Sequence, residues 1–131
     1  MTASWTIPAP TTVLRDWLRD AALACDEAVY AGGLPETVDL PAVAVHRISG
    51  AVDEPLDLGV YQFDCWATTG PTAEQLAYEI VSLLVSTPPT DITGLRFAGA
   101  TVESVVAAPD PAVPDQYRYA VTAQVVTVPT T

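Results

Sequence analysis

The chain contains no lysine, a single histidine and only two cysteines among its 131 residues. Its five basic residues are therefore all arginines, and they stand against 16 acidic residues, which gives a formal net charge of -11. Binding to nucleic acid needs cationic side chains that replace the counterions of the phosphates, so this composition argues against a nucleic-acid-binding protein. Without lysine, Schiff-base chemistry is also excluded.

Metal and nucleophilic sites have few candidate residues. Zinc needs three or four Cys or His ligands, and the chain offers only Cys25, His46 and Cys65, widely spaced. The acidic residues are scattered rather than placed at alternating positions of one loop, which argues against calcium. No Gly-x-Ser-x-Gly elbow, phosphate-binding glycine loop or dinucleotide fingerprint is present. We therefore predict no catalytic residue, no cofactor and no metal, and a protein that is not an enzyme.

Targeting and membrane segments are also missing from the sequence. No uninterrupted apolar run approaches the roughly 18 residues of a membrane span. The first residues lack the basic and apolar regions of a secretory signal. We expect a soluble protein made in the cytoplasm, with Cys25 and Cys65 reduced and acting as small hydrophobic residues.

Two stretches have helical periodicity. The first predicts a helix capped by Thr11 or Thr12 and running to about Tyr30. The second, over 72–87, has the strongest apolar period in the chain and stops at Pro88-Pro89. Its start is marked by a capping residue, Thr69 or Thr72, and by Gln75 three residues after Thr72.

Four stretches favour strands, at about 42–49, 58–68, 94–108 and 116–128. Between the first two we expect a long polar loop at 50–57, and between the last two a stiff, proline-rich loop at 109–115. In the second strand, alternation predicts one core face, made of Tyr61, Phe63, Cys65 and Ala67. Gly99 marks a bulge or a close approach in the third strand.

The element order α-β-β-α-β-β predicts an α+β fold, a two-layer domain whose four-stranded, mainly antiparallel sheet carries both helices on one face. We expect one domain over residues 1–131, with an extended N-terminal arm at 1–10 and a short tail at 129–131. The other sheet face mixes polar and apolar residues, which suits packing against another subunit, although a solvated face is an open alternative. The candidate interface residues on this face are Asp64, Trp66, Arg118 and Gln124.

Asp64, Cys65 and Trp66 at the end of the second strand raise the question of a reactive site. Trp66 could raise the pKa of Asp64 for acid-base work, yet no second carboxylate is placed by the sequence to meet it. We interpret the triplet as strand alternation, with Cys65 inward and its two neighbours outward.

A family resemblance covers roughly residues 12 to 128. The strand "YQFDCWA" at 61–67, the segment "TTGPTAEQLAYEIVSLL" after it, and "GLRFAGATVESVVAAPDPAVPDQYRYAVTAQVVTV" at 94–128 resemble the tail terminator (tail completion) proteins of long-tailed siphovirus bacteriophages, particularly those that infect actinobacteria. None of these segments is a catalytic motif. Their order and spacing together carry the resemblance.

The resemblance implies a virion structural protein that assembles in the host cytoplasm and is located at the neck-proximal end of the tail. Such a subunit forms a homo-oligomeric, hexameric ring that caps the tail tube, stops its polymerisation and joins it to the neck (head-tail connector) proteins. The loops 50–57 and 109–115 correspond to those that grip the major tail tube protein. DNA passes the lumen without specific binding, and an acidic bore would repel its phosphates. We expect some of Asp53, Glu54 and Asp57 to line it, with an acidic charge that serves only solubility as the open alternative.

Two alternatives remain open at this stage. A neck or head-to-tail connector subunit, a stopper or adaptor, can share the ring architecture. A small cytoplasmic ligand-binding domain or enzyme would instead have an apolar pocket between the helix at 72–87 and the sheet.

Overall fold

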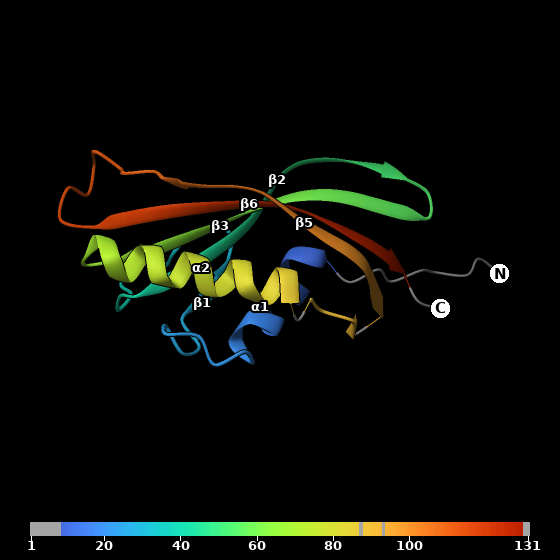
Figure 1. The fold of residues 1–131 in the computed structure, drawn as a ribbon, viewed down its shortest axis with the longest axis horizontal. Coiled ribbons are helices and arrows are strands. Elements are labelled where there is room, and N and C mark those ends of the chain that lie inside the picture. Colours follow the sequence, from blue (N-terminus) through green and yellow to red (C-terminus); the bar gives the residue numbers. More distant parts are fainter. Residues whose placement is uncertain (1–8, 87, 93, 130–131) are drawn as a thin grey trace.

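A computed structural model of the chain describes residues 9–86, 88–92 and 94–129 (Figure 1). Residues 1–8 of the arm predicted at 1–10 and the last two residues of the predicted tail lie outside these ranges, and Pro10, predicted in the arm, is the first residue of α1. The elements in chain order are α1 (Pro10–Arg19), β1 (Val29–Ala31), β2 (Ala42–Asp53), β3 (Leu56–Ala67), α2 (Gly70–Ser86), β4 (Asp91–Ile92), β5 (Leu95–Ala107) and β6 (Tyr117–Pro129).

The strands form one six-stranded mixed sheet in the order β1-β2-β3-β6-β5-β4. The pair β1–β2 is parallel, and the other four pairs are antiparallel. The predicted fold class, a four-stranded and mainly antiparallel sheet in the order α-β-β-α-β-β, is therefore wrong. The missed strands β1 and β4 are three and two residues long. Strands this short cannot show the two-residue alternation that identifies a strand in a sequence.

The prediction of a long polar loop at 50–57 is also wrong. Strand β2 runs on to Asp53 and β3 begins at Leu56, so only Glu54 and Pro55 separate the two strands. Gly50 has a φ of 116°, and a Cβ atom there would collide with the backbone of β3. The glycine that reads as a loop residue is therefore needed inside the hairpin because no side chain fits.

Helix α1 is shorter than predicted and starts earlier. Its N-cap is Ala9, which makes no side-chain capping bond, so neither Thr11 nor Thr12 caps it. Pro10 occupies the first turn, where its fixed φ suits a helix start. The helix ends at Arg19 and not near Tyr30, and Ala22 beyond it has a positive φ of 55°. The Arg19 Nε donates to the Val29 carbonyl at 2.9 Å, which ties the helix end to β1.

Helix α2 matches its prediction more closely. Thr69 accepts a hydrogen bond at its Oγ1 from the Thr72 N–H, at 3.4 Å, so the earlier of the two candidate caps is the one used. The Thr72–Gln75 capping box does not form because Thr72 is already inside the helix. The buried stripe of the helix is Ala73, Leu76, Ala77, Ile80 and Leu84.

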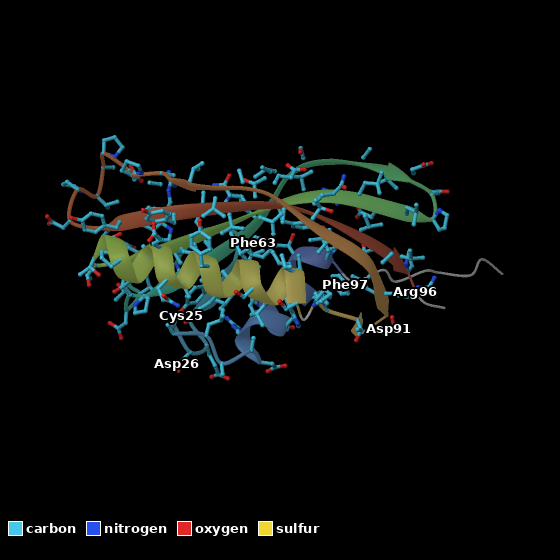
Figure 2. The ribbon with its side chains drawn as sticks, in the orientation of Figure 1. Cys25, Asp26, Phe63, Asp91, Arg96 and Phe97 are labelled. Atoms are coloured by element: carbon cyan, nitrogen blue, oxygen red, sulfur yellow. The ribbon has the colours of Figure 1, made fainter. Side chains whose placement is uncertain are left out.

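Both helices lie on the same face of the sheet and enclose the core (Figure 1). The predicted core face of β3 is confirmed, because Tyr61, Phe63, Cys65 and Ala67 are fully buried. Phe63 lies between the sheet and α2, and the buried Cys25 lies on the helical side (Figure 2). The bulge predicted at Gly99 is confirmed by the register shift between Phe97 and Gly99. The helices leave the opposite face of the sheet uncovered.

Candidate functional site

The uncovered sheet face brings Trp66 and Arg118 together. They are direct cross-strand partners on β3 and β6, and the Arg118 Cζ lies 5.0 Å from the centre of the Trp66 ring. The Arg118 Nε also donates to the Ala108 carbonyl at 2.6 Å, which fixes the guanidinium over the ring. Both side chains are half-buried. The pair is thus a pre-positioned aromatic and cationic surface of the kind found in protein interfaces.

Asp64 lies deeper in this face than the sequence suggested. Its residue exposure is 5%. The Gln62 Nε2 donates to its Oδ1 at 2.7 Å, and the His46 Nε2 lies 3.8 Å from its Oδ2. Its cross-strand neighbours are Ala44 and Ala120, whose small side chains leave room for the carboxylate. Asp64 therefore organises a polar cluster and presents little surface of its own.

His46 also belongs to this cluster, although it is not among the predicted interface residues. It pairs directly with Gln62 across β2 and β3, a relation that depends on the strand register. Gln124, the fourth predicted interface residue, pairs with Val60 and Thr101. It stands six residues from Arg118 on the same strand, or about 20 Å at roughly 3.3 Å per residue. The four predicted residues share one face but not one contact area.

The acidic residues Asp53, Glu54 and Asp57 lie together at the tip of the β2–β3 hairpin. The Arg47 Nη1 donates to both carboxylate oxygens of Asp57, at 2.7 and 2.9 Å, so the charge of this residue is offset. Asp53 and Glu54 are exposed. The uncompensated negative charge of the tip therefore comes from these two residues.

Tyr61 packs beneath the hairpin and shields its base. The ring lies over Gly59, where a Cβ atom would come within 2.7 Å of the Tyr61 hydroxyl. The Arg47 Cζ is 6.0 Å from the ring centre. Burial raises the pKa of the Tyr61 hydroxyl, and the nearby Asp57 carboxylate raises it further. The hydroxyl therefore stays protonated, as a packing residue requires.

The two cysteines are buried, free thiols. Burial raises the pKa of Cys25 from its ordinary 9.0 to about 11, and it raises that of Cys65 further. Because the thiolate is the reactive form, both thiols are poor nucleophiles at neutral pH. Cys65 is fully buried, so its predicted inward orientation is confirmed.

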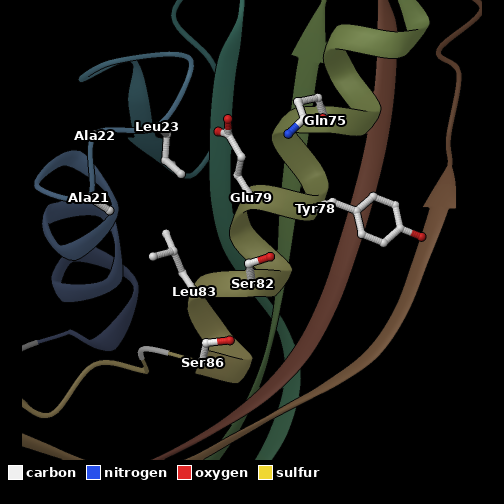
Figure 3. Close-up of a pocket in the computed structure, with 9 residues that line it drawn as sticks. All are labelled: Ala21, Ala22, Leu23, Gln75, Tyr78, Glu79, Ser82, Leu83 and Ser86. Carbon is white, nitrogen blue, oxygen red and sulfur yellow. The ribbon is translucent and has the colours of Figure 1, made fainter.

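A surface hollow of about 440 Å³ lies between the outer side of α2 and residues 21–23 (Figure 3). Glu79 crosses this space, and its Oε2 accepts a hydrogen bond from the Ala24 N–H at 3.0 Å. Between α2 and the sheet, where an enzyme or ligand-binding domain was predicted to have its pocket, Leu76 and Ile80 are fully buried in the core.

Among the residues that the structure describes, no three His, Cys, Asp or Glu side chains are grouped as metal ligands would be. Within the same residues, neither helix combines the length and the apolar character needed to cross a membrane.

This chain has a match among solved structures but none among family models or curated proteins. Among solved structures, one chain of the virion of a native gene transfer agent particle superposes with a TM-score of 0.65, covering 92% of this chain and 95% of that chain at 18% sequence identity. The two chains share a fold. At this identity the likeness concerns the arrangement of elements, and the tail terminator resemblance stays a prediction.

Proposed function

We propose that this chain is a structural subunit of a phage-type virion with no enzymatic role. The observation that carries the proposal is the fold match, which extends over nearly the whole of both chains and whose other member is a component of a virion particle. The chemistry of the chain supports it, because its two thiols are buried and their pKa values are raised.

Within the virion, we propose the tail terminator role. A terminator ring must present one surface to the tail tube and another to the neck. The sheet is long, with about 40 Å of strand in the 12 residues of β3. The β2–β3 hairpin and the β5–β6 loop at 108–116 project from its opposite ends (Figure 1). One end would grip the tail tube protein and the other would meet the neck (head-tail connector) proteins.

The uncovered sheet face is the proposed contact surface for another subunit in the particle. Trp66 with Arg118 would provide the anchor, since aromatic and arginine side chains dominate interface energetics. Asp64 would hold the neighbouring polar side chains in place, and Gln124 would lie at the periphery of the contact.

The hairpin tip is the proposed acidic lining of the DNA passage. In a hexameric ring the exposed Asp53 and Glu54 would each be repeated six times, and Asp57 would hold the tip through Arg47. Negative potential in the bore would keep the phosphates of passing DNA from adhering, because each phosphate contact with a cation slows release.

A partner assay tests the role. Purified protein is mixed with the tail tube protein and, separately, with the portal-side connector proteins of the same particle, and complexes are separated by size. A terminator binds the tube protein directly. A neck or connector subunit is the second candidate, because the matched chain comes from a whole virion particle. Such a subunit binds only the portal side. Binding to neither contradicts both roles.

A further inference from the structure

The two flanks of the sheet each leave a stretch of backbone without a strand partner among the described residues. On one flank, β1 pairs only with residues 43–45 of β2, so residues 46–53 have a free edge. On the other, β4 pairs only with residues 95–96 of β5. The Phe97 N–H is taken by the Thr90 carbonyl at 3.2 Å, and residues 98–107 then have a free edge.

The two free edges lie at the same level along the strand direction of the sheet. Through the paired strands, Gly50 is aligned with Gly59, Val125 and finally Ala100. Three successive antiparallel pairings separate β2 from β5, so these two strands run in opposite directions. A second copy placed beside β2 in the same orientation therefore offers its β5 antiparallel to it, which is the geometry of strand addition.

The charges on the two edges are complementary. Arg47 and the neighbouring His46 are the basic residues of 46–51, which contains no acidic residue, whereas Glu103 is the only charged residue of 98–107. Arg47 is aligned with Val102, next to Glu103, through Tyr61 and Ala123. Addition of β5 to β2 thus brings Glu103 to the level of Arg47, whose guanidinium also donates to Asp57.

We propose that copies of this chain join edge to edge, with residues 46–51 of β2 in one copy pairing antiparallel with residues 98–104 of β5 in the next. The contact is head-to-tail, so it uses both flanks of every copy and pairs these two stretches in every copy once a ring closes. It rests on the proposed ring function and specifies which surfaces make the ring.

The short strands limit the register of this contact. Val45, next to β1, is at the height of Val105, so β1 prevents pairing of β5 beyond residue 104. At the other end β4 occupies the flank of residues 95–96. Bulges between Arg47 and Ser49, and between Val102 and Ser104, add bending to both edges, as a sheet that continues around a ring requires.

Cysteine pairs test the contact directly. Ser49 and Thr101 are aligned through Val60 and Gln124 and lie on the uncovered face. Within one chain they are three strand spacings apart, about 14 Å, too far for a disulfide. Under mild oxidation, a mixture of Ser49→Cys and Thr101→Cys proteins should give a disulfide-linked heterodimer. The double variant should give a series of disulfide-linked oligomers whose largest member is the closed ring. The control pair joins Ser49→Cys with Ser86→Cys, which lies exposed on α2.

Native mass measurement of the same samples separates the possible results. If rings form and the yield of the 49–101 disulfide exceeds that of the 49–86 control, the edge contact is supported. If rings form but the 49–101 yield does not exceed that of the control, the edge contact is overturned and the ring function still stands. Absence of both rings and disulfides across the accessible concentrations contradicts the ring function and the contact together.

Hydrogen exchange gives a readout that does not depend on disulfide geometry. On assembly, amides within 46–51 and 98–104 should exchange at least about tenfold more slowly than in the dilute monomer, because edge N–H groups gain partners. Amides of the exposed loop at 110–115 serve as the internal control. Rings with unchanged exchange in both edge stretches would overturn the proposal.

Discussion

The guanidinium of Arg118 lies 5.0 Å from the centre of the Trp66 ring, and the two residues are directly paired across β6 and β3. The strand register alone brings them together, 52 positions apart in the chain. This pair is the most interface-like feature of the uncovered face, and its contribution can be measured.

Replacing Trp66 with alanine should weaken assembly more than folding. The side chain is half-buried, so we expect a loss of about 1–3 kcal/mol in the free energy of unfolding, part of it from the lost contact with Arg118. In sedimentation experiments, the protein concentration needed for assembly should be at least tenfold higher for the variant than for the unmodified protein. Tyr78→Ala, an exposed aromatic on the helical side, is the matched control. Normal assembly of a folded Trp66→Ala protein would show that Trp66 is not an anchor.

Gly50→Ala should destabilise the hairpin strongly. The φ of 116° is unfavourable for alanine, and the added Cβ would collide with the backbone of Leu58 and Gly59. We expect a loss of roughly 2 kcal/mol or more in urea denaturation. Gly99→Ala is the control, because a Cβ there meets nothing within 4 Å. Equal stability of the two variants would contradict the described hairpin.

The Arg47–Asp57 ion pair should contribute modestly to stability. Its side chains are 31% and 24% exposed, so water and salt screen the interaction. Asp57→Asn should lower the unfolding free energy by about 0.5–1 kcal/mol at low salt, and the difference should shrink in 1 M salt. Asp53→Asn at the same tip should have little effect, because Asp53 is exposed. A cost for Asp57→Asn that is independent of salt would point to a packing effect instead.

The thiols should react slowly in the native protein and in a fixed order. The pKa of Cys25 is about 11, so roughly one thiol in a thousand is ionised at pH 8. Alkylation of Cys25 should accelerate with pH up to about 11, and Cys65 should react later. Because ionisation is easier in the unfolded chain, the contribution of Cys25 to stability is fully present below pH 9.0 and is lost as pH rises towards 11. Mass spectrometry showing Cys65 modified first would be inconsistent with its burial.

The acidic tip should influence DNA passage and not ring formation. Asp53→Lys combined with Glu54→Lys reverses two exposed charges per subunit, so ejection of DNA should slow, most clearly at low salt. Ser86→Lys, an exposed position on α2 away from the tip and from both sheet edges, is the control. Unchanged ejection and infectivity in the tip variant would remove these residues from the proposed bore.

The sequence predicts those parts of the fold that carry a long periodic pattern. The four long strands and α2 fall close to their predicted places because 12 to 17 residues show a clear alternation or helical stripe. Strands β1 and β4 have no such pattern. The end of α1 was missed because Ala21 and Cys25 continue the apolar spacing, while Ala22 takes a positive φ that no residue type announces.

The candidate surfaces were predictable only in part. Alternation assigns Asp64, Trp66 and Arg118 to one face, but it does not give the register that puts Arg118 over Trp66 or His46 near Asp64. The sequence predicts a loop at 50–57 because Gly50 and Pro55 are common in turns. The pairing of β2 and β3 through most of this stretch depends on contacts between residues that are not local in the sequence. The free edges on which ring formation is proposed to depend also follow from such contacts.

Imaging of tails assembled with and without this protein tests the central claim most directly. The account predicts tubes of uniform length, capped at the neck-proximal end by a ring, when the protein is present, and overlong tubes of variable length when its gene is deleted. Tubes of the same uniform length in both preparations would contradict the tail terminator role.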